Sequence, residues 1–288
     1  MTAQSRANLA GVLIGDGLPV AVMGVLNVSP ESFHAGSVHA TTAGLLAAAL
    51  AMVEAGAVLI DVGARSTAPY LATAVSDAEE TDRLARAVEV LAGKLPVPVS
   101  ADTSRPEAAR AALEAGARVI NDVCGLADAG VARLVAGHGA GVILMASPKA
   151  APAPSPAGGD PVTTVRGRLE AALAAARAAG IADDRVVLDP GIGFFRDTAR
   201  PWHEWDACVL RGLGDLAALG RPLCVAVSRK SFLGAITGRA APAERLAGSL
   251  AATAVAVIHG AALVRTHDVA ETVDAVRVAE RLRPQAGP

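Results

Sequence analysis

The feature that most constrains the fold is a regular alternation of short, β-branched segments with longer, Ala-rich segments of helical periodicity. Such alternation is typical of parallel strands joined by crossover helices. We predict eight strands, over residues 20–26, 58–62, 97–101, 119–123, 141–145, 186–188, 223–227 and 263–266. We predict helices over residues 41–55, 77–91, 106–115, 129–136, 162–179, 204–219, 243–259 and 269–281.

Eight such units favour a closed barrel over an open doubly wound sheet, because no GxGxxG fingerprint follows the first strand. Several helices also end in a glycine that suits a left-handed cap, namely Gly56, Gly116, Gly180 and Gly260. We therefore interpret residues 1–288 as one α/β domain, a (β/α)8 TIM barrel with its active site at the C-terminal ends of the strands. Residues 1–18 are taken as an N-terminal extension.

Three segments are predicted to be long loops that follow strands of the same barrel. Residues 147–160 are rich in Pro, Ala and Gly, and the strand and helix alternation resumes directly after them. Residues 29–40 and 64–76 follow the first and second predicted strands.

Composition excludes several classes of partner. The formal net charge is −2 and aromatic residues make up 2%, so neither a basic face nor a set of stacking platforms for nucleic acid is expected. No leader pattern and no apolar run of about 18 residues is present, so no membrane partner is predicted. Cys124, Cys208 and Cys224 lack metal-ligand spacing and are interpreted as reduced, buried residues of a cytoplasmic protein.

Polar residues follow almost every predicted strand, and in a parallel barrel they converge on one face. The fifth predicted strand is the exception, because it ends in the apolar residue Met145. The polar residues are Asn27, Asp61, Asp102, Asn121, Asp122, Asp189, Ser228, Arg229, Lys230, Arg265 and His267. Each has an ordinary alternative: Asp189 can cap the turn at Pro190, and Asp102 can lie at the start of a helix. Their convergence, more than any one of them, predicts a ligand site.

The charges divide this face into two sectors. Arg229, Lys230, Arg265 and His267 should gather positive charge that suits a phosphate or a diphosphate. Asp102, Asn121 and Asp189 offer acceptors and an amide that suit a flat heterocycle with several N–H donors.

The same segments resemble the dihydropteroate synthase family over residues 22–279. The resemblance lies in MGVLNVSPESF (23–33), IDVGARST (60–67), SADTS (100–104), INDVCG (120–125), LDPGIGF (188–194), SRKSFLG (228–234) and VRTHDV (264–269). It implies a TIM-barrel transferase of folate biosynthesis that uses Mg2+ and forms a homodimer. The implied reaction condenses 6-hydroxymethyl-7,8-dihydropterin diphosphate with 4-aminobenzoate, or a related arylamine, and releases diphosphate.

The resemblance also implies residue roles. Catalysis falls to Asp102, Lys230, Arg265 and His267; pterin binding to Asp102, Asn121, Met145, Asp189, Phe194, Lys230 and Arg265; arylamine binding to Thr67, Pro69 and Ser231. Asn27, Arg265 and His267 match the diphosphate region, with Asn27 at the Mg2+ ligand position.

The segment after the second strand departs from the family pattern. Ala68 stands where the family has an arginine that contacts 4-aminobenzoate, and Arg65 stands where it has an acid. Either Arg65 compensates for the missing arginine or the acceptor is a different arylamine. Two alternatives remain at this level: a pterin-dependent methyltransferase with a corrinoid partner, and a catalytically inactive pterin-binding paralogue.

Overall fold

The computed structural model describes residues 5–28, 42–65, 75–148, 159–198 and 200–283. Its centre is a closed barrel of parallel strands in the order β10-β3-β4-β5-β6-β7-β8-β9. These strands are β3 (Ala21–Asn27), β4 (Leu59–Gly63), β5 (Val99–Asp102), β6 (Val119–Asp122), β7 (Gly141–Met145), β8 (Val186–Asp189), β9 (Leu223–Ala226) and β10 (Ala261–Thr266). The predicted (β/α)8 barrel is thus confirmed.

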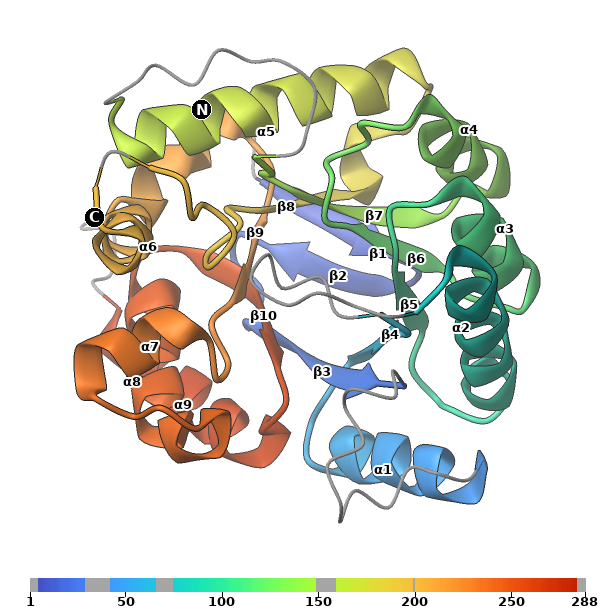
Figure 1. Cartoon of the computed structure of the whole chain (residues 1–288), viewed down its shortest axis with the longest axis horizontal. Helices are drawn as coiled ribbons and strands as arrows, with labels where there is room; N and C mark the ends of the chain where they lie inside the picture. The colour runs from blue at the N-terminus through green and yellow to red at the C-terminus, as the bar shows by residue number, and fades with distance from the viewer. Residues whose placement is uncertain (1–4, 29–41, 66–74, 149–158, 199, 284–288) are drawn as a thin grey trace.

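Helices surround this barrel on its outside (Figure 1). They are α1 (Thr42–Glu54), α2 (Asp77–Ala92), α3 (Pro106–Glu114), α4 (Ala129–His138), α5 (Pro161–Ala178), α6 (Trp202–Arg211), α7 (Ser231–Thr237), α8 (Leu246–Ile258) and α9 (Val269–Leu282). In the described part of the chain, 3-10 helices accompany them at η3 (Asp183–Arg185), η4 (Leu213–Leu219) and η5 (Pro242–Arg245). The predicted glycine caps are confirmed, because Gly56, Gly116, Gly180 and Gly260 all have positive φ.

The structure divides two of the predicted helices and adds one that was not predicted. The helix predicted over 243–259 begins as the 3-10 helix η5 and continues as α8. The helix predicted over 204–219 is divided into α6 and η4 at Gly212, where an added Cβ would come within 2.4 Å of the Val162 side chain. The glycine therefore allows α5 to approach closely, and the α-helix ends there. The short helix α7 was not predicted, because SRKSFLG was interpreted only as a site segment.

The N-terminal extension contains a hairpin that the sequence interpretation did not predict. Strands β1 (Arg6–Leu9) and β2 (Val12–Gly15) pair antiparallel. Ala7, Leu9 and Ile14 are buried in one cluster with the inward-facing residues Ala21, Met23, Leu59, Val119, Ile143, Val187, Cys224 and Leu263. The hairpin therefore closes the end of the barrel at which the strands begin, and Figure 1 shows it lying across the barrel centre.

The larger part of the core lies between the strands and the helices. It is built mainly from Val, Leu and Ala side chains, as the Ala-rich helices require for close packing on the barrel. All three cysteines are free; Cys224 is buried, whereas Cys124 and Cys208 are only partly so, against the burial predicted for all three.

Within the described residues, no single helix is long and apolar enough to cross a bilayer. One bent pair, Ser231–Thr237 with Pro242–Ile258, meets the length and composition test, with 75° between its parts.

Candidate active site

Strand periodicity explains how the candidate site is built. Side chains along a strand alternate between the barrel interior and the helix layer, so residues two apart share a side. The interior apolar residues Leu59, Val119, Ile143, Val187 and Leu263 are each followed two positions later by Asp61, Asn121, Met145, Asp189 and Arg265. The interior thus changes from an apolar layer to a polar one towards the C-terminal strand ends.

A buried ion cluster occupies the centre of this polar layer. Arg265 donates a hydrogen bond from Nε to Asp61 Oδ2 at 2.7 Å and one from Nη2 to Asp102 Oδ2 at 2.8 Å. Asp61 is fully buried and also accepts hydrogen bonds from Ser100 Oγ at 2.6 Å and Asn121 Nδ2 at 3.0 Å. One guanidinium therefore joins two carboxylates that come from different strands.

Asp102 is the incompletely bonded member of the ion cluster. Its Oδ1 is buried and has no hydrogen-bond partner among the described residues. Burial raises the pKa of Asp102 to about 7, against the opposing effect of Arg265. A buried carboxylate oxygen without a donor is costly, so this atom is suited to receive an N–H group from a ligand.

Lys230 and Asp189 form a second polar pair at the C-terminal end of the barrel strands, which we call the mouth. Lys230 follows β9, its Nζ donates a hydrogen bond to the Ile192 carbonyl, and it lies 5.0 Å from the centroid of the Phe194 ring. Burial lowers the pKa of Lys230 and raises that of Asp189, and each group opposes the shift of the other. Asp189 Oδ1 accepts a hydrogen bond from Gly191 N at 2.7 Å. One carboxylate oxygen of Asp189 therefore caps the turn at Pro190, as the alternative interpretation predicted.

The predicted cluster of four cations is only partly realised. Arg229 donates two hydrogen bonds to Asp268, which balances its charge. His267 Nδ1 lies 3.0 Å from Ser228 Oγ, and burial together with Arg265 lowers the pKa of His267 to about 4. His267 is therefore neutral at pH 7 in the protein without ligand, and the mouth has less positive charge than the sequence suggested.

The remaining predicted residues lie at the same mouth where they are described. Met145 is buried at the end of β7, paired in register with Asp189. Asn27 ends β3 with an exposed side chain. An added Cβ on Gly63 would be 3.4 Å from Asn27 Oδ1 and 3.7 Å from Asp102 Oδ2, so Asn27 and Asp102 lie on either side of this glycine.

The residues predicted near an arylamine are only partly described. Ser231 begins α7, and its Oγ accepts a hydrogen bond from Arg196 at 2.5 Å. Thr67 and Pro69 lie outside the described residues. Asp122 has a structural role, since its carboxylate accepts hydrogen bonds from Cys124 N at 2.7 Å and Leu126 N at 2.9 Å.

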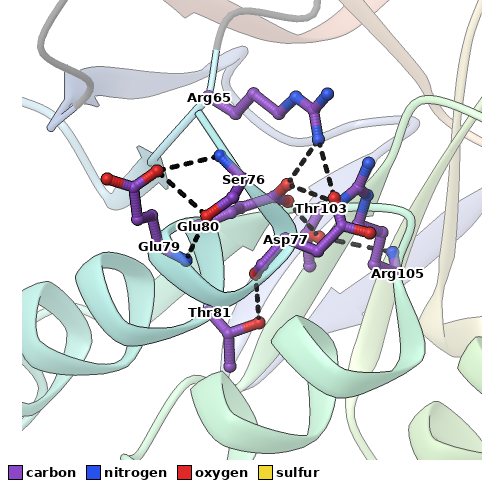
Figure 2. A network of polar contacts seen from close by, with 8 residues as sticks. All are labelled: Arg65, Ser76, Asp77, Glu79, Glu80, Thr81, Thr103 and Arg105. Carbon is purple, nitrogen blue, oxygen red and sulfur yellow. Dashed lines mark hydrogen bonds and ion pairs between the residues drawn. The ribbon is translucent and has the colours of Figure 1, made fainter. Parts of the chain in front are cut away.

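Arg65 belongs to a separate polar network at the start of α2 (Figure 2). It lies 3.3 Å from Asp77 and 3.5 Å from Glu80, and Arg105 pairs with the same two acids. Buried Glu80 also accepts a hydrogen bond from Thr103 Oγ1 at 2.9 Å. The charge of Arg65 is therefore balanced within the fold, which argues against Arg65 as a replacement for an arginine at position 68.

Sequence reasoning did not single out Arg196 or Asp206, which lie beside the candidate site, and it missed the contacts that Asp61 makes within it. Asp61 was recognised as a strand-end acid, but no pattern shows that it binds Arg265 from 204 residues away. Asp206 looks like an ordinary helical acid in the sequence, yet it is fully buried beside the turn that follows β8. The usable signal for Asp61 was its place two residues after an interior leucine.

Comparisons with known proteins agree with this geometry. A family model described as "Pterin binding enzyme" matches residues 23–267. The chain therefore belongs to the pterin binding enzymes, the class that a barrel with this polar mouth defines.

Among its relatives, dihydropteroate synthase of Escherichia coli strain K12 is 38% identical over 262 residues, which are 90% of each chain. A solved Xanthomonas albilineans dihydropteroate synthase with 4-aminobenzoic acid is 40% identical, with a TM-score of 0.85 over 99% of this chain and 100% of that one. The same enzyme in complex with 7,8-dihydropteroate is 38% identical, with a TM-score of 0.82 over 98% and 100% of the two chains. Within its family the chain thus belongs with the dihydropteroate synthases, as its sequence motifs predicted.

Proposed function

We propose that the barrel mouth joins the methylene carbon of 6-hydroxymethyl-7,8-dihydropterin diphosphate to the amine of 4-aminobenzoate or a related arylamine. The amine lone pair forms the new C–N bond as the C–O bond to diphosphate breaks, and the amine then loses one proton. The products are 7,8-dihydropteroate and diphosphate. The observation that carries the proposal is the buried Asp102 carboxylate, with one oxygen held by Arg265 and the other without a donor among the described residues.

The pterin ring fits the polar layer chemically. We assign its N–H groups to Asp102, Asn121 and Asp189, which are all buried, and its carbonyl region to Lys230. Met145 and Phe194 supply apolar contact for the ring faces. The negative charge of Asp102 also favours positive charge that develops on the methylene carbon as the leaving group departs.

The leaving diphosphate is assigned to Asn27, Arg265 and His267. Arg265 is fixed by two carboxylates, so little reorganisation is needed when it faces a developing anion. Neutral His267 can take up a proton once a polyanion lies beside it. Charge balance here, with substrate positioning, supplies the catalysis, and a neutral arylamine needs no strong base.

The donor set also fits Mg2+ that is carried largely by the substrate. No group of three His, Cys, Asp or Glu side chains that suits a metal occurs in the described part of the chain. Mg2+ usually keeps several waters and binds through substrate phosphates with one or two protein oxygens. The exposed amide oxygen of Asn27 would serve as such a ligand, and the bound ion would add Lewis-acid charge to the leaving group.

The arylamine is assigned to Ser231, together with Thr67 and Pro69. Arg196 supports this assignment, because its guanidinium bonds Ser231 Oγ and brings positive charge to the side where a benzoate carboxylate would lie. Ion pairing within the fold makes Arg65 a poor candidate for that role.

We also propose a homodimer and a cytoplasmic location. Of the six exposed large apolar side chains in the described ranges, Ile236, Val255, Val278 and Leu282 lie on α7, α8 and α9. These helices are neighbours in Figure 1, so a second copy could cover this face. The three free thiols agree with a reducing compartment.

Product analysis by mass after incubation with the pterin diphosphate, a panel of arylamines and Mg2+ tests the reaction. Pterin–arylamine adduct and diphosphate should appear in equal amounts, and only when arylamine and Mg2+ are both present. Asp102→Ala and Lys230→Ala should each reduce turnover by at least about 100-fold, whereas Asp82→Ala, a change of an exposed acid, should not. Unchanged turnover in the first two variants would contradict the proposal.

A further inference from the structure

Asp206 is a buried carboxylate to which the proposed chemistry gives no role. It lies on α6 and is fully buried. Its Oδ1 accepts a hydrogen bond from Gly193 N at 2.8 Å, while its Oδ2 has no hydrogen-bond partner within the described ranges. A half-bonded carboxylate in the interior is costly unless a nearby charge compensates it.

The turn that Asp206 holds is the one that surrounds the Lys230 side chain. Gly193 has φ +88°, and an added Cβ would come 3.0 Å from Lys230 Cδ. The residues on either side of Gly193 also contact the lysine: Nζ donates a hydrogen bond to the Ile192 carbonyl and lies 5.0 Å from the Phe194 ring centroid. Any shift of the Gly193 peptide would therefore move the lysine.

Both backbone polar groups of Gly193 are held, in the two peptides that flank its Cα. Asp206 accepts its N–H, and Arg196 Nε donates to its carbonyl at 3.1 Å. Phe195 and Trp205, the neighbours of these two side chains in sequence, stack with ring centroids 5.4 Å apart. This stacking fixes α6 against the turn, so Asp206 has little freedom to move away.

Charges around the lysine complete the arrangement. Asp189 on β8 and Asp206 on α6 favour the ammonium form of Lys230, Arg265 on β10 opposes it, and Cys224 on β9 also faces it. Asp206 in turn faces Lys230, Arg196 and His203. Lys230 is thus the partly buried cation whose charge Asp206 helps to balance.

We propose that Asp206 is a positioning residue for Lys230: it fixes the turn on which the lysine stem lies and supplies a second negative charge beside the ammonium group. The inference rests on the proposed function, in which Lys230 contacts the pterin. It adds a requirement, namely that the site needs α6 as well as the strand ends.

The pH profile of kcat/KM for the pterin diphosphate tests this role. The alkaline limb is the fall in kcat/KM at high pH. If it comes from deprotonation of Lys230, it should be absent in Lys230→Arg, because arginine stays protonated in this range. Asp206→Asn keeps an oxygen for Gly193 N–H but removes the charge, so it should move this limb to lower pH by about one unit. Asp215→Asn, a change of an exposed acid on η4, is the matched control and should leave the limb in place.

Asp206→Ser removes the same charge, so whichever variant folds reports on the limb. An alkaline limb that stays at the wild-type pH in a folded Asp206 variant would overturn the inference while leaving the reaction itself intact. Failure of the wild-type enzyme to form a pterin–arylamine adduct would instead overturn the proposed function.

A thermodynamic cycle separates this role from a merely structural one. In a Lys230→Met background, Asp206→Asn should no longer weaken equilibrium binding of the pterin, because the group that it positions is gone. Equal weakening in both backgrounds would show that Asp206 acts on the fold and not through the lysine.

Discussion

Arg265 on β10 and Asp61 on β4 form a buried ion pair at 2.7 Å that bridges across β3, the strand that lies between them in the barrel. Asp102 joins the same guanidinium at 2.8 Å. The pair therefore links barrel closure to the proposed substrate site, since the arginine that holds Asp61 also orients Asp102.

Asp61→Asn should be strongly destabilising although it changes few atoms. It removes a fully buried charge and leaves Arg265 with one carboxylate, and loss of one partner from such a pair costs on the order of 3 kcal/mol. Urea denaturation measures this loss. Asp82→Asn, which breaks the exposed pair with Arg86, should cost less than about 1 kcal/mol. Equal effects in the two variants would show that the buried pair has no special weight.

The raised pKa of Asp102 predicts an acidic limb in activity. At pH values below about 7 the carboxyl is neutral in the free enzyme, and a neutral group cannot favour positive charge on the methylene carbon. We expect kcat/KM for the pterin diphosphate to fall as pH drops through this value. Asp122 and Asp206 have pKa values raised to about 6, so Asp102→Asn is needed for the assignment. The limb should disappear in Asp102→Asn, along with most activity.

The same shift predicts how stability changes with pH. Folding raises the pKa of Asp102 from 3.8, so its contribution to stability is complete below this value and is lost as pH rises to about 7. The difference in unfolding free energy between wild type and Asp102→Asn should therefore change across this window and be constant above it. A difference independent of pH would show that burial does not control this carboxyl.

His267 should take up a proton when diphosphate binds. Its pKa is lowered to about 4 by burial and by the cations nearby, so it is neutral at pH 6, and a bound polyanion favours the charged form. Calorimetry of diphosphate and Mg2+ binding at pH 6, in buffers with different ionisation enthalpies, measures the protons taken up. His267→Asn should take up fewer protons than wild type, whereas His259→Asn at the end of α8 should match it.

Much of this site could be predicted from the sequence because a parallel barrel brings strand ends together whatever their separation along the chain. Asp102, Asn121, Asp189, Lys230 and Arg265 needed only that rule and correct strand positions. The sequence pattern could not show which charged side chains form ion pairs with one another. Arg65 seemed available to bind a ligand, and only the structure shows that it pairs with Asp77 and Glu80.

The hairpin escaped prediction for a related reason. Residues 6–15 have mixed polarity and the glycines Gly11 and Gly15, which individually suggest a loop. Each strand has only four residues, and what stabilises them is the apolar barrel end, which a local pattern cannot show.

Because the hairpin packs on the barrel end opposite the polar mouth, a change in its core should lower the stability of the protein without affecting substrate binding. Leu9 is fully buried at the end of the barrel where the strands begin, far along the strands from the polar mouth, so Leu9→Ala should cost about 2–4 kcal/mol of unfolding free energy. KM for both substrates should stay within about twofold of wild type at temperatures where the variant is folded, because about 0.4 kcal/mol corresponds to that factor. Leu13→Ala in the same hairpin changes a side chain that is 59% exposed and should have little effect on stability. If Leu9→Ala and Leu13→Ala had equal thermal midpoints, the hairpin would not be the closure of the barrel that its buried side chains indicate.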